Sequence, residues 1–180
     1  MKVSIITVCH NSENTLIDTL NSVLSQNYHN IEHIIVDGMS TDNTHNIIKD
    51  YKHHNKKVII ESDDGIYDAM NKGIKSATGE IITILNSDDI YQSSNVISEV
   101  VKDIKLDNNN NDIFLGDVVF FKEKNFSFVR RFYSSKHFKP WMLKIGLMPP
   151  HPSSFIKKKV YDENGLYDAS LKLAADFDIF

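Results

Sequence analysis

Hydrophobic residues in the first half of the chain follow two alternating patterns, short β-branched runs and longer stretches with helical spacing. The short runs predict buried strands at residues 3–8, 31–36, 58–60 and 81–85. The stretches in which apolar residues recur every three or four positions predict helices near residues 12–24, 42–51, 66–77 and 94–105. This alternation of strand and helix indicates an α/β domain with a mostly parallel sheet flanked by helices.

Polar residues suggest where two of these helices begin. Ser12 or Asn14 is expected to cap the first helix, and Asp42 the second. The buried face of the first helix is expected to carry Leu16, Leu20, Val23 and Leu24. Residues 113–180 are richer in aromatic and basic residues and contain all four prolines, so we expect a less regular half that packs on the same sheet.

Composition favours a folded globular domain, since 41% of the 180 residues are hydrophobic and 24% are charged. A single cysteine, Cys9, and the lack of a long apolar run fit a cytoplasmic protein. The net charge of -4 combines an acidic first half with a basic stretch, residues 118–161, in which Glu123 is the one acid. The acidic half argues against nucleic acid as a partner. The basic stretch could face an anionic acceptor or membrane, or form a solvated surface.

Polar clusters follow the predicted strands at the points where these strands end. They lie at residues 10–11, 37–40, 61–65 and 86–89. Because ligands of open parallel sheets bind beyond the carboxyl ends of the strands, these clusters are expected to meet at one crevice. Asp88 and Asp89 are suited to Mn²⁺ or Mg²⁺, which would neutralise the charge of a departing diphosphate; a turn with a helix cap is the structural alternative.

Several motifs, in this order along the chain, resemble family 2 of the inverting glycosyltransferases. They occupy residues 3–11, 34–42, 65–73, 79–80 and 85–89, with residues 151–155, 165–168 and 174–178 resembling the acceptor-side half. The resemblance implies a single domain of the Rossmann-like GT-A fold over residues 1–180. Residues 1–90 would bind the nucleotide sugar, and residues 91–180 would form an incomplete acceptor-side half. Because the chain stops at Phe180, we expect a domain truncated at its C-terminal end.

The resemblance also assigns roles to particular residues. The nucleotide would be held by Thr7, Val8, His10, Asn11, Asp37, Ser40 and Asp88. Asp37 would accept a hydrogen bond from the imide of the base, which favours uracil or thymine, while Ser40 could assist or only cap the next helix. Donor sugar and diphosphate would meet Asp64, Asn71 and Lys72, although Lys72 could equally be an exposed helix lysine.

The metal and the catalytic base are assigned in the same way. Asp89 would ligate Mn²⁺ or Mg²⁺ directly, and His151 would be a further metal ligand or a plain loop histidine. Asp176 would take the proton from the acceptor hydroxyl, with Asp178 as the competing candidate. Two departures from the family pattern are Asn86, where many members have Asp, and Met70, where many have Arg.

The function that the resemblance implies is sugar transfer, as a hexosyltransferase, from a nucleotide-diphosphate donor such as a UDP-sugar. The acceptor would be a saccharide or a polyprenyl-linked oligosaccharide in cell-surface polysaccharide synthesis. A peripheral contact with the inner face of the cell membrane is a further expectation, motivated by the aromatic and basic residues between Phe132 and Lys144. Two alternatives remain, a truncated nucleotide-sugar-binding module without turnover and a nucleotidyltransferase.

Overall fold

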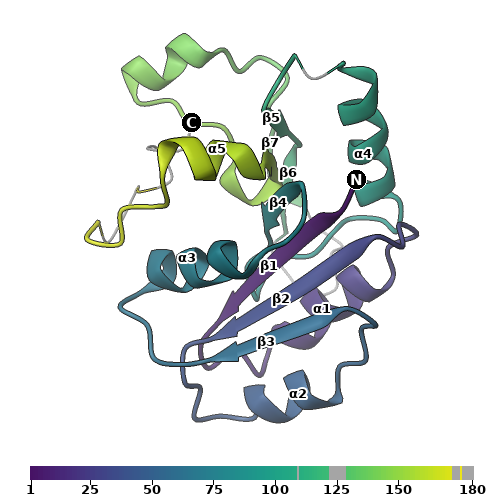
Figure 1. The fold of residues 1–180 in the computed structure, drawn as a ribbon, viewed down its shortest axis with the longest axis vertical. Helices are drawn as coiled ribbons and strands as arrows, with labels where there is room; N and C mark the ends of the chain where they lie inside the picture. Colours follow the sequence, from purple (N-terminus) through teal and green to yellow (C-terminus); the bar gives the residue numbers. More distant parts are fainter. Residues whose placement is uncertain (109, 122–128, 172–174, 176–180) are drawn as a thin grey trace.

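The computed structural model describes residues 1–108, 110–121, 129–171 and 175. Among these residues, six strands form one sheet in the order β3-β2-β1-β4-β8-β5 (Figure 1). Its strands are β1 Val3–Cys9, β2 Ile31–Asp37, β3 Lys56–Ile60, β4 Ile81–Ile84, β5 Ile113–Leu115 and β8 Ser154–Lys157. The first four strands are parallel and β8 runs antiparallel to β4 and β5, which confirms the mostly parallel sheet expected from the sequence.

Helices cover both faces of this sheet, as Figure 1 shows. They are α1 Leu16–Leu24, α2 Thr44–Asp50, α3 Ile66–Ser76, α4 Val96–Leu106 and α5 Lys158–Asn164. Apolar residues of α3 and α5 pack on one face, and those of α1, α2 and α4 pack on the other. Because both faces are covered, every residue of the central strands β1 and β2 is buried, which explains why apolar, β-branched residues predominate in both.

The helix starts differ in detail from the sequence-based expectation. Helix α1 follows Thr15 and has no side-chain cap, so the caps proposed at Ser12 and Asn14 are wrong. Leu24, expected on the buried face, is exposed because, at about 100° per residue, it lies to the side of the stripe formed by the buried Leu16, Thr19, Leu20 and Val23. Helix α2 follows Asn43 and has no side-chain cap, so the cap expected at Asp42 is also wrong; the Asp42 carboxylate lies one residue earlier and accepts a hydrogen bond from the Thr44 amide at 3.0 Å.

A glycine inside α3 has a packing reason. A Cβ atom at Gly73 would collide with the side chain of Ile6 on β1. The glycine therefore lets α3 approach β1 closely, and this approach compensates for its poor helix propensity. This close packing holds α3 over β1, the strand whose carboxyl end borders the candidate active site.

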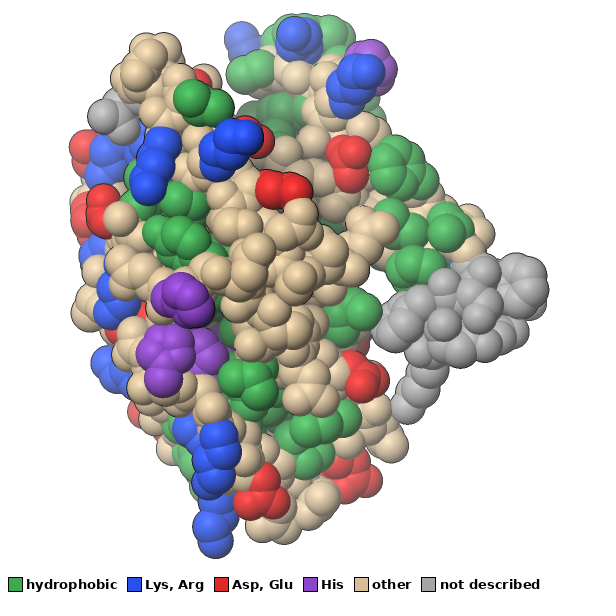
Figure 2. Space-filling view, turned by 90° about the vertical axis from the view of Figure 1, so that its right-hand side faces the viewer, with side chains coloured by type: hydrophobic (Ala, Val, Ile, Leu, Met, Phe, Trp, Pro, Cys, Tyr) green, Lys and Arg blue, Asp and Glu red, His purple; other side chains and the backbone are tan. Residues whose placement is uncertain are grey.

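The second half is less regular, as expected. Strands β6 Val118–Phe121 and β7 Val129–Tyr133 form a separate antiparallel pair, and η1 Pro140–Ile145 and η2 His151–Ser153 are 3-10 helices. Large apolar side chains are exposed here, and Figure 2 shows hydrophobic (green) and basic (blue) side chains together at its upper end. Within the described ranges, no helix combines the length and the apolar character needed to cross a bilayer.

Candidate active site

The site lies where the strand order of the sheet reverses. From β1 the chain proceeds through β2 to β3 on one side, and then returns to place β4 on the other side of β1. Strand β1 pairs with β2 as far as Cys9 and Asp37, but its pairing with β4 ends at Ile6 and Ile84. Among the described strands, β2 is therefore the one neighbour of the last three residues of β1, residues 7–9. Such a switch point is the usual ligand site of an open α/β sheet.

Thr7 and Val8 lie on this last part of β1, and both are buried. The Thr7 hydroxyl is 3.0 Å from Nε2 of His33, whose Nδ1 is 2.8 Å from the Tyr51 hydroxyl. Complete burial lowers the pKa of His33 to about 3, so this imidazole is neutral. The Thr7 side chain is thus engaged in the core, and its backbone is the part available for a ligand.

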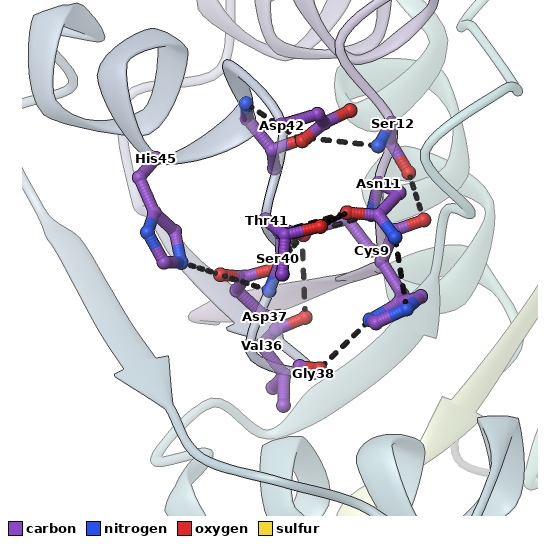
Figure 3. Close-up of polar contacts among 12 residues, drawn as sticks. Cys9, Asn11, Ser12, Val36, Asp37, Gly38, Ser40, Thr41, Asp42 and His45 are labelled. Carbon is purple, nitrogen blue, oxygen red and sulfur yellow. Dashed lines mark hydrogen bonds and ion pairs between the residues drawn. The ribbon is translucent and has the colours of Figure 1, made fainter.

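Asp37, at the end of β2, is fully enclosed by polar partners (Figure 3). Its carboxylate accepts a hydrogen bond from the Ser40 hydroxyl and another from the Ser40 amide at 3.3 Å. Nε2 of His45 forms an ion pair with the other carboxylate oxygen. The Cys9 thiol lies 3.8 Å from Asp37, and burial together with this nearby charge raises the pKa of the thiol. Cys9 is therefore a protonated donor rather than a thiolate.

A second network joins the loop after β1 to the loop after β2. Nδ1 of His10 is 2.7 Å from the Gly38 carbonyl oxygen, so the proton must be on Nδ1. Nε2 of His10 then accepts a hydrogen bond from the Asn11 side-chain amide at 3.1 Å. The Asn11 side-chain oxygen in turn accepts from the Thr41 amide at 2.8 Å (Figure 3). These bonds fix His10 and Asn11 beside Asp37, and their binding of a nucleotide stays a prediction.

Asp63, which belongs to the polar cluster at residues 61–65 but received no role from the sequence, also faces this crevice. A Cβ atom at Gly38 would collide with the Asp63 carboxylate and would lie 3.4 Å from Nδ1 of His10. Asp64, the residue chosen from the sequence, is exposed, and its amide donates to Asp68 at 3.2 Å. Because Asp63 and Asp64 are adjacent, the sequence alone could not tell which carboxylate turns toward Gly38.

The structure gives Asn71 and Lys72 hydrogen-bonding partners within the protein. The Asn71 side chain is buried, donates to the Tyr167 carbonyl at 2.8 Å and accepts from the Tyr167 amide at 3.0 Å. The Lys72 ammonium lies 3.0 Å from the Asp68 carboxylate and 2.5 Å from the Ser62 carbonyl oxygen. A donor sugar or diphosphate would have to compete with these contacts, so direct roles for both residues stay predictions.

An acidic cluster lies at the end of β4, next to the loop that follows β1. The Ser87 hydroxyl is 2.9 Å from the Ser12 hydroxyl, which joins the two loops. Asp88 is exposed, whereas Asp89 is largely withdrawn from water. Burial, and then the charge of Asp88, raise the pKa of Asp89 to about 6. The adjacent carboxylates therefore repel each other in the free chain, and a cation between them would relieve this repulsion.

The donor atoms of this acidic cluster suit a hard divalent cation. Oδ1 of Asn86 is buried without a hydrogen-bond partner among the described residues, while its amide nitrogen is 3.4 Å from Asp89. Carboxylate and amide oxygens are the ligands that Mg²⁺ and Mn²⁺ prefer. In the part of the chain that the structure describes, no three His, Cys, Asp or Glu side chains are grouped closely enough to hold a metal. A cation here would thus need oxygens from a ligand or water as well.

His151 begins η2, which packs against β4. Its Nε2 is 2.7 Å from the Tyr167 hydroxyl, and the two rings meet edge to face. The same Tyr167 holds Asn71 through its backbone, so this tyrosine connects η2 with α3. The candidate bases Asp176 and Asp178 lie outside the described residues.

Comparison with known proteins agrees with this architecture. Residues 4–165 match the model of glycosyl transferase family 2. A poly-beta-1,6-N-acetyl-D-glucosamine synthase of Staphylococcus epidermidis is 41% identical over 90 residues, which cover 49% of this chain and 22% of the synthase. The uncharacterized glycosyltransferases of Rickettsia typhi and Rickettsia prowazekii, which are 29% and 28% identical over 99% of this chain, are longer proteins, and the chain spans 57% of each.

Two solved structures share the fold. S. aureus TarS 1-349 in complex with UDP superposes with a TM-score of 0.77 at 23% identity, over 99% of this chain and 54% of TarS 1-349. The mannosyltransferase PcManGT from Pyrobaculum calidifontis, in complex with GDP-Man and Mn²⁺, gives a TM-score of 0.69 at 18% identity, over 98% of this chain and 50% of PcManGT. With a family match over most of its length and the expected α/β sheet, the chain belongs to glycosyl transferase family 2.

Proposed function

We propose that this glycosyltransferase chain moves a sugar from a UDP-sugar to a saccharide or polyprenyl-linked acceptor, with inversion at the anomeric carbon. One observation carries the proposal. The carboxylate of Asp37 ends β2, the acidic pair Asp88 and Asp89 follows β4, and these two strands flank β1. Such a pair of sites matches the two ends of a nucleoside diphosphate, with the base at Asp37 and the diphosphate near Asp89.

The base is proposed to be uracil. A carboxylate oxygen accepts hydrogen bonds, so Asp37 would match the imide N–H of uracil or thymine once it exchanges one of its present contacts for the base. Thr7 and Val8 would contribute backbone contacts, and the fixed His10 and Asn11 would border the base. Asp88, which is exposed beside this crevice, would bind the ribose. The complex of TarS with UDP is consistent with this choice of nucleotide.

The acidic cluster is proposed to bind Mn²⁺ or Mg²⁺ through Asp89, with Asn86 Oδ1 and Asp88 in support. When bound, the cation would neutralise negative charge on the diphosphate as it departs. The unpaired buried oxygen of Asn86 and the raised pKa of Asp89 both favour a cation at this place. The presence of Mn²⁺ in the PcManGT complex agrees with this assignment.

The chemical step requires a base on the acceptor side, for which Asp176 is proposed. Its carboxylate would take the proton of the acceptor hydroxyl while that oxygen forms a bond to the anomeric carbon. The bond from the anomeric carbon to the diphosphate breaks on the opposite side, and its electron pair leaves with UDP. Attack opposite the leaving group inverts the configuration, so an α-linked donor gives a β-linked product.

The acceptor is proposed to belong to a bacterial cell-surface polysaccharide, a proposal supported by the similar S. epidermidis protein, which is a synthase of poly-beta-1,6-N-acetyl-D-glucosamine. Exposed Trp141 and Ile145 lie on η1, which also contains Lys144 and directly follows Lys139. Apolar and basic side chains together favour the interface of an anionic membrane. A peripheral contact with the inner face of the membrane would bring a lipid-linked acceptor to the enzyme.

Calorimetric titration tests the donor site. The chain is titrated with UDP, GDP and dTDP, with and without Mn²⁺, and the titrations are repeated with Asp37→Ala and Asp89→Ala. We expect UDP binding that depends on Mn²⁺ and is weakened at least about tenfold by either substitution, whereas Asp103→Asn on the exposed side of α4 leaves it unchanged. Equal affinity for all three nucleotides, or full binding by Asp37→Ala, would contradict the proposal.

A further inference from the structure

A groove of about 330 Å³ lies beside β5, the strand at one end of the six-stranded sheet. It is lined by residues of β5, of the loop before it and of the segment that leads into η1. These residues are Asn111, Asp112, Ile113, Leu115, Phe138 and Pro140. The volume is at the lower end of the range for ligand pockets, about 300–1,000 Å³. The function proposed above gives these residues no role, and we call this feature the β5 groove.

The segment that contributes Phe138 is anchored to the carboxyl end of β5. The Ser135 hydroxyl donates a hydrogen bond to the Leu115 carbonyl oxygen at 3.3 Å, and the Ser135 amide donates to the Asp117 carboxylate at 2.8 Å. The Phe138 amide then donates to the Ser135 carbonyl oxygen at 2.9 Å, which closes a turn. Because these bonds hold the turn against β5, the groove is already formed in the free chain.

The chemistry of the β5 groove is mainly apolar. Ile113 and Leu115 are two residues apart on a strand, so both side chains point to the same face of the sheet. Among the described lining residues, Asp112 is the one that carries a charge, and it is paired with Lys157 at 3.2 Å and with Lys159 at 2.7 Å. Walls of this kind favour a hydrocarbon ligand over a polar one.

The short helix η1 extends this apolar surface toward solvent. Its sequence is Pro-Trp-Met-Leu-Lys-Ile, and none of its residues is buried. The side chains of Trp141 and Ile145 are 56% and 62% exposed. In Figure 1, η1 is the light-green helix at the top, and Figure 2 shows hydrophobic and basic side chains together at that end of the molecule. Large apolar side chains gathered at the surface indicate a contact with another apolar body.

Basic side chains accompany this apolar surface. Residues 129–150 contain no Asp or Glu, and their basic residues are Arg130, Arg131, Lys136, Lys139 and Lys144. Lys139 is exposed and stands in the chain between the groove residues Phe138 and Pro140. Within the described ranges, neither Lys136 nor Lys139 forms an ion pair. Ammonium groups beside an apolar groove match a ligand that has a hydrocarbon tail and an anionic head.

The β5 groove is close to the candidate active site. Strands β4 and β5 both run antiparallel to β8, so they run in the same direction as each other. The Leu115 end of β5 therefore lies at the edge of the sheet where Asp88 and Asp89 follow β4. Only β8 separates the two strands, which places them roughly 10 Å apart. A sugar on the head group of a lipid in the groove could thus approach the donor.

We propose that the β5 groove binds the part of a polyprenyl phosphate nearest its head group, with the isoprenoid tail against Ile113, Leu115 and Phe138. Lys139, assisted by Lys136, contacts the phosphate. The inference rests on the proposed function, because the lipid is taken to be the carrier of the acceptor saccharide. It adds a defined site for the lipid to the general contact of η1 with the membrane, and it explains how one lipid is held while its sugar reacts.

The test uses the single tryptophan of the chain, Trp141, which directly follows the groove residue Pro140. Its fluorescence is recorded during titration with farnesyl phosphate, a short polyprenyl phosphate, below the concentration at which micelles form. Inorganic phosphate and dodecyl phosphate, which has the same main-chain length without methyl branches, are titrated in parallel. We expect a saturable response to farnesyl phosphate and none to inorganic phosphate. Dodecyl phosphate should bind at least about fourfold more weakly, the value of one buried methyl group.

Two variants and a control locate the site. Phe138→Glu places a charge in the apolar wall and should weaken farnesyl phosphate binding at least about tenfold. Lys139→Glu puts an anion beside the phosphate and should weaken it to a similar extent. Leu106→Glu is the control, since Leu106 is 68% exposed at the end of α4, on the other face of the sheet, and the affinity should not change. Thermal unfolding checks each fold, and Lys139→Glu carries the test alone if Phe138→Glu unfolds.

The outcomes separate this inference from the proposed donor site. If farnesyl phosphate gives no saturable response, or binds both groove variants as tightly as the parent chain, the β5 groove is not a lipid site. Equal affinity for dodecyl phosphate would overturn the assignment to a polyprenyl lipid, because a straight acyl chain would then fit as well. UDP binding is measured by calorimetry on the same protein. A chain that binds UDP but no farnesyl phosphate contradicts this inference alone, and one that binds farnesyl phosphate but no UDP contradicts the donor site.

Discussion

Replacing Asp89 by asparagine should stabilise the metal-free chain and at the same time remove its affinity for Mn²⁺. Burial and the adjacent charge of Asp88 raise the pKa of Asp89 to about 6 in the folded chain, compared with about 4 in an unfolded one. The folded state therefore binds this proton more tightly. Protonation of Asp89 therefore stabilises the fold. This stabilisation is present below about pH 4, declines as the pH rises and is lost above about pH 6, where Asp89 is ionised in the folded and the unfolded chain.

The structure sets the size of this effect. A difference of roughly two pH units between the folded and unfolded pKa corresponds to an upper limit of about 3 kcal/mol at neutral pH. The asparagine side chain carries no charge, so Asp89→Asn should raise the free energy of unfolding at pH 7.5 by about 1–3 kcal/mol. For a domain of this size, that change corresponds to a Tm increase on the order of 2–10 °C.

The assay is thermal unfolding, followed by circular dichroism in chelator-treated buffer at pH 4 and pH 7.5. The gain should be present at pH 7.5 and mostly absent at pH 4. The exposed Asp103→Asn serves as control and should change stability by less than about 0.5 kcal/mol at either pH. Added Mn²⁺ should raise the Tm of the parent chain but not that of Asp89→Asn. An unchanged or lowered Tm for Asp89→Asn at pH 7.5 would refute the argument that Asp89 is an uncompensated charge.

Two further predictions concern the crevice and its support. Gly38→Ala should lower UDP affinity on the order of tenfold, because the new Cβ displaces the Asp63 carboxylate. The Tm should change little, since the end of the Asp63 side chain can move aside. Unchanged UDP affinity in calorimetry would mean that Asp63 does not border the nucleotide. Asn71→Leu should cost about 2–4 kcal/mol in urea unfolding, because it removes both hydrogen bonds between α3 and the Tyr167 backbone; a cost below about 0.5 kcal/mol would show that these two bonds are replaced by water.

The sequence predicted the part of the fold that depends on local pattern. Short runs rich in β-branched residues identified β1 to β4; because β1, β2 and β4 are buried along their whole length, these three lack the regular alternation of a half-exposed strand. Since parallel strands end at one edge, the polar clusters that follow them could be placed at a common crevice from the sequence alone. Strand β8 was not predicted. It is four residues long, and its place between β4 and β5 depends on antiparallel pairing with partners distant in sequence.

The details of the site depend on side-chain directions that a sequence does not encode locally. The choice between Asp63 and Asp64 is decided by the turn that leads into α3, where Gly65 has a φ of 121°. Asn71 is a candidate sugar ligand by sequence, but its partner, Tyr167, is brought against it from 96 residues away. The contact of His45 with Asp37 likewise arises from the way α2 folds back over the end of β2.

A crystal structure of the chain with UDP and Mn²⁺, recorded with anomalous scattering at the manganese edge, tests the central claim most directly. The account predicts one manganese peak in contact with the Asp89 carboxylate and the diphosphate. It also predicts the uracil imide within about 2.7–3.2 Å of the Asp37 carboxylate. Manganese bound away from residues 86–89, or a uracil ring that does not reach Asp37, would contradict the account.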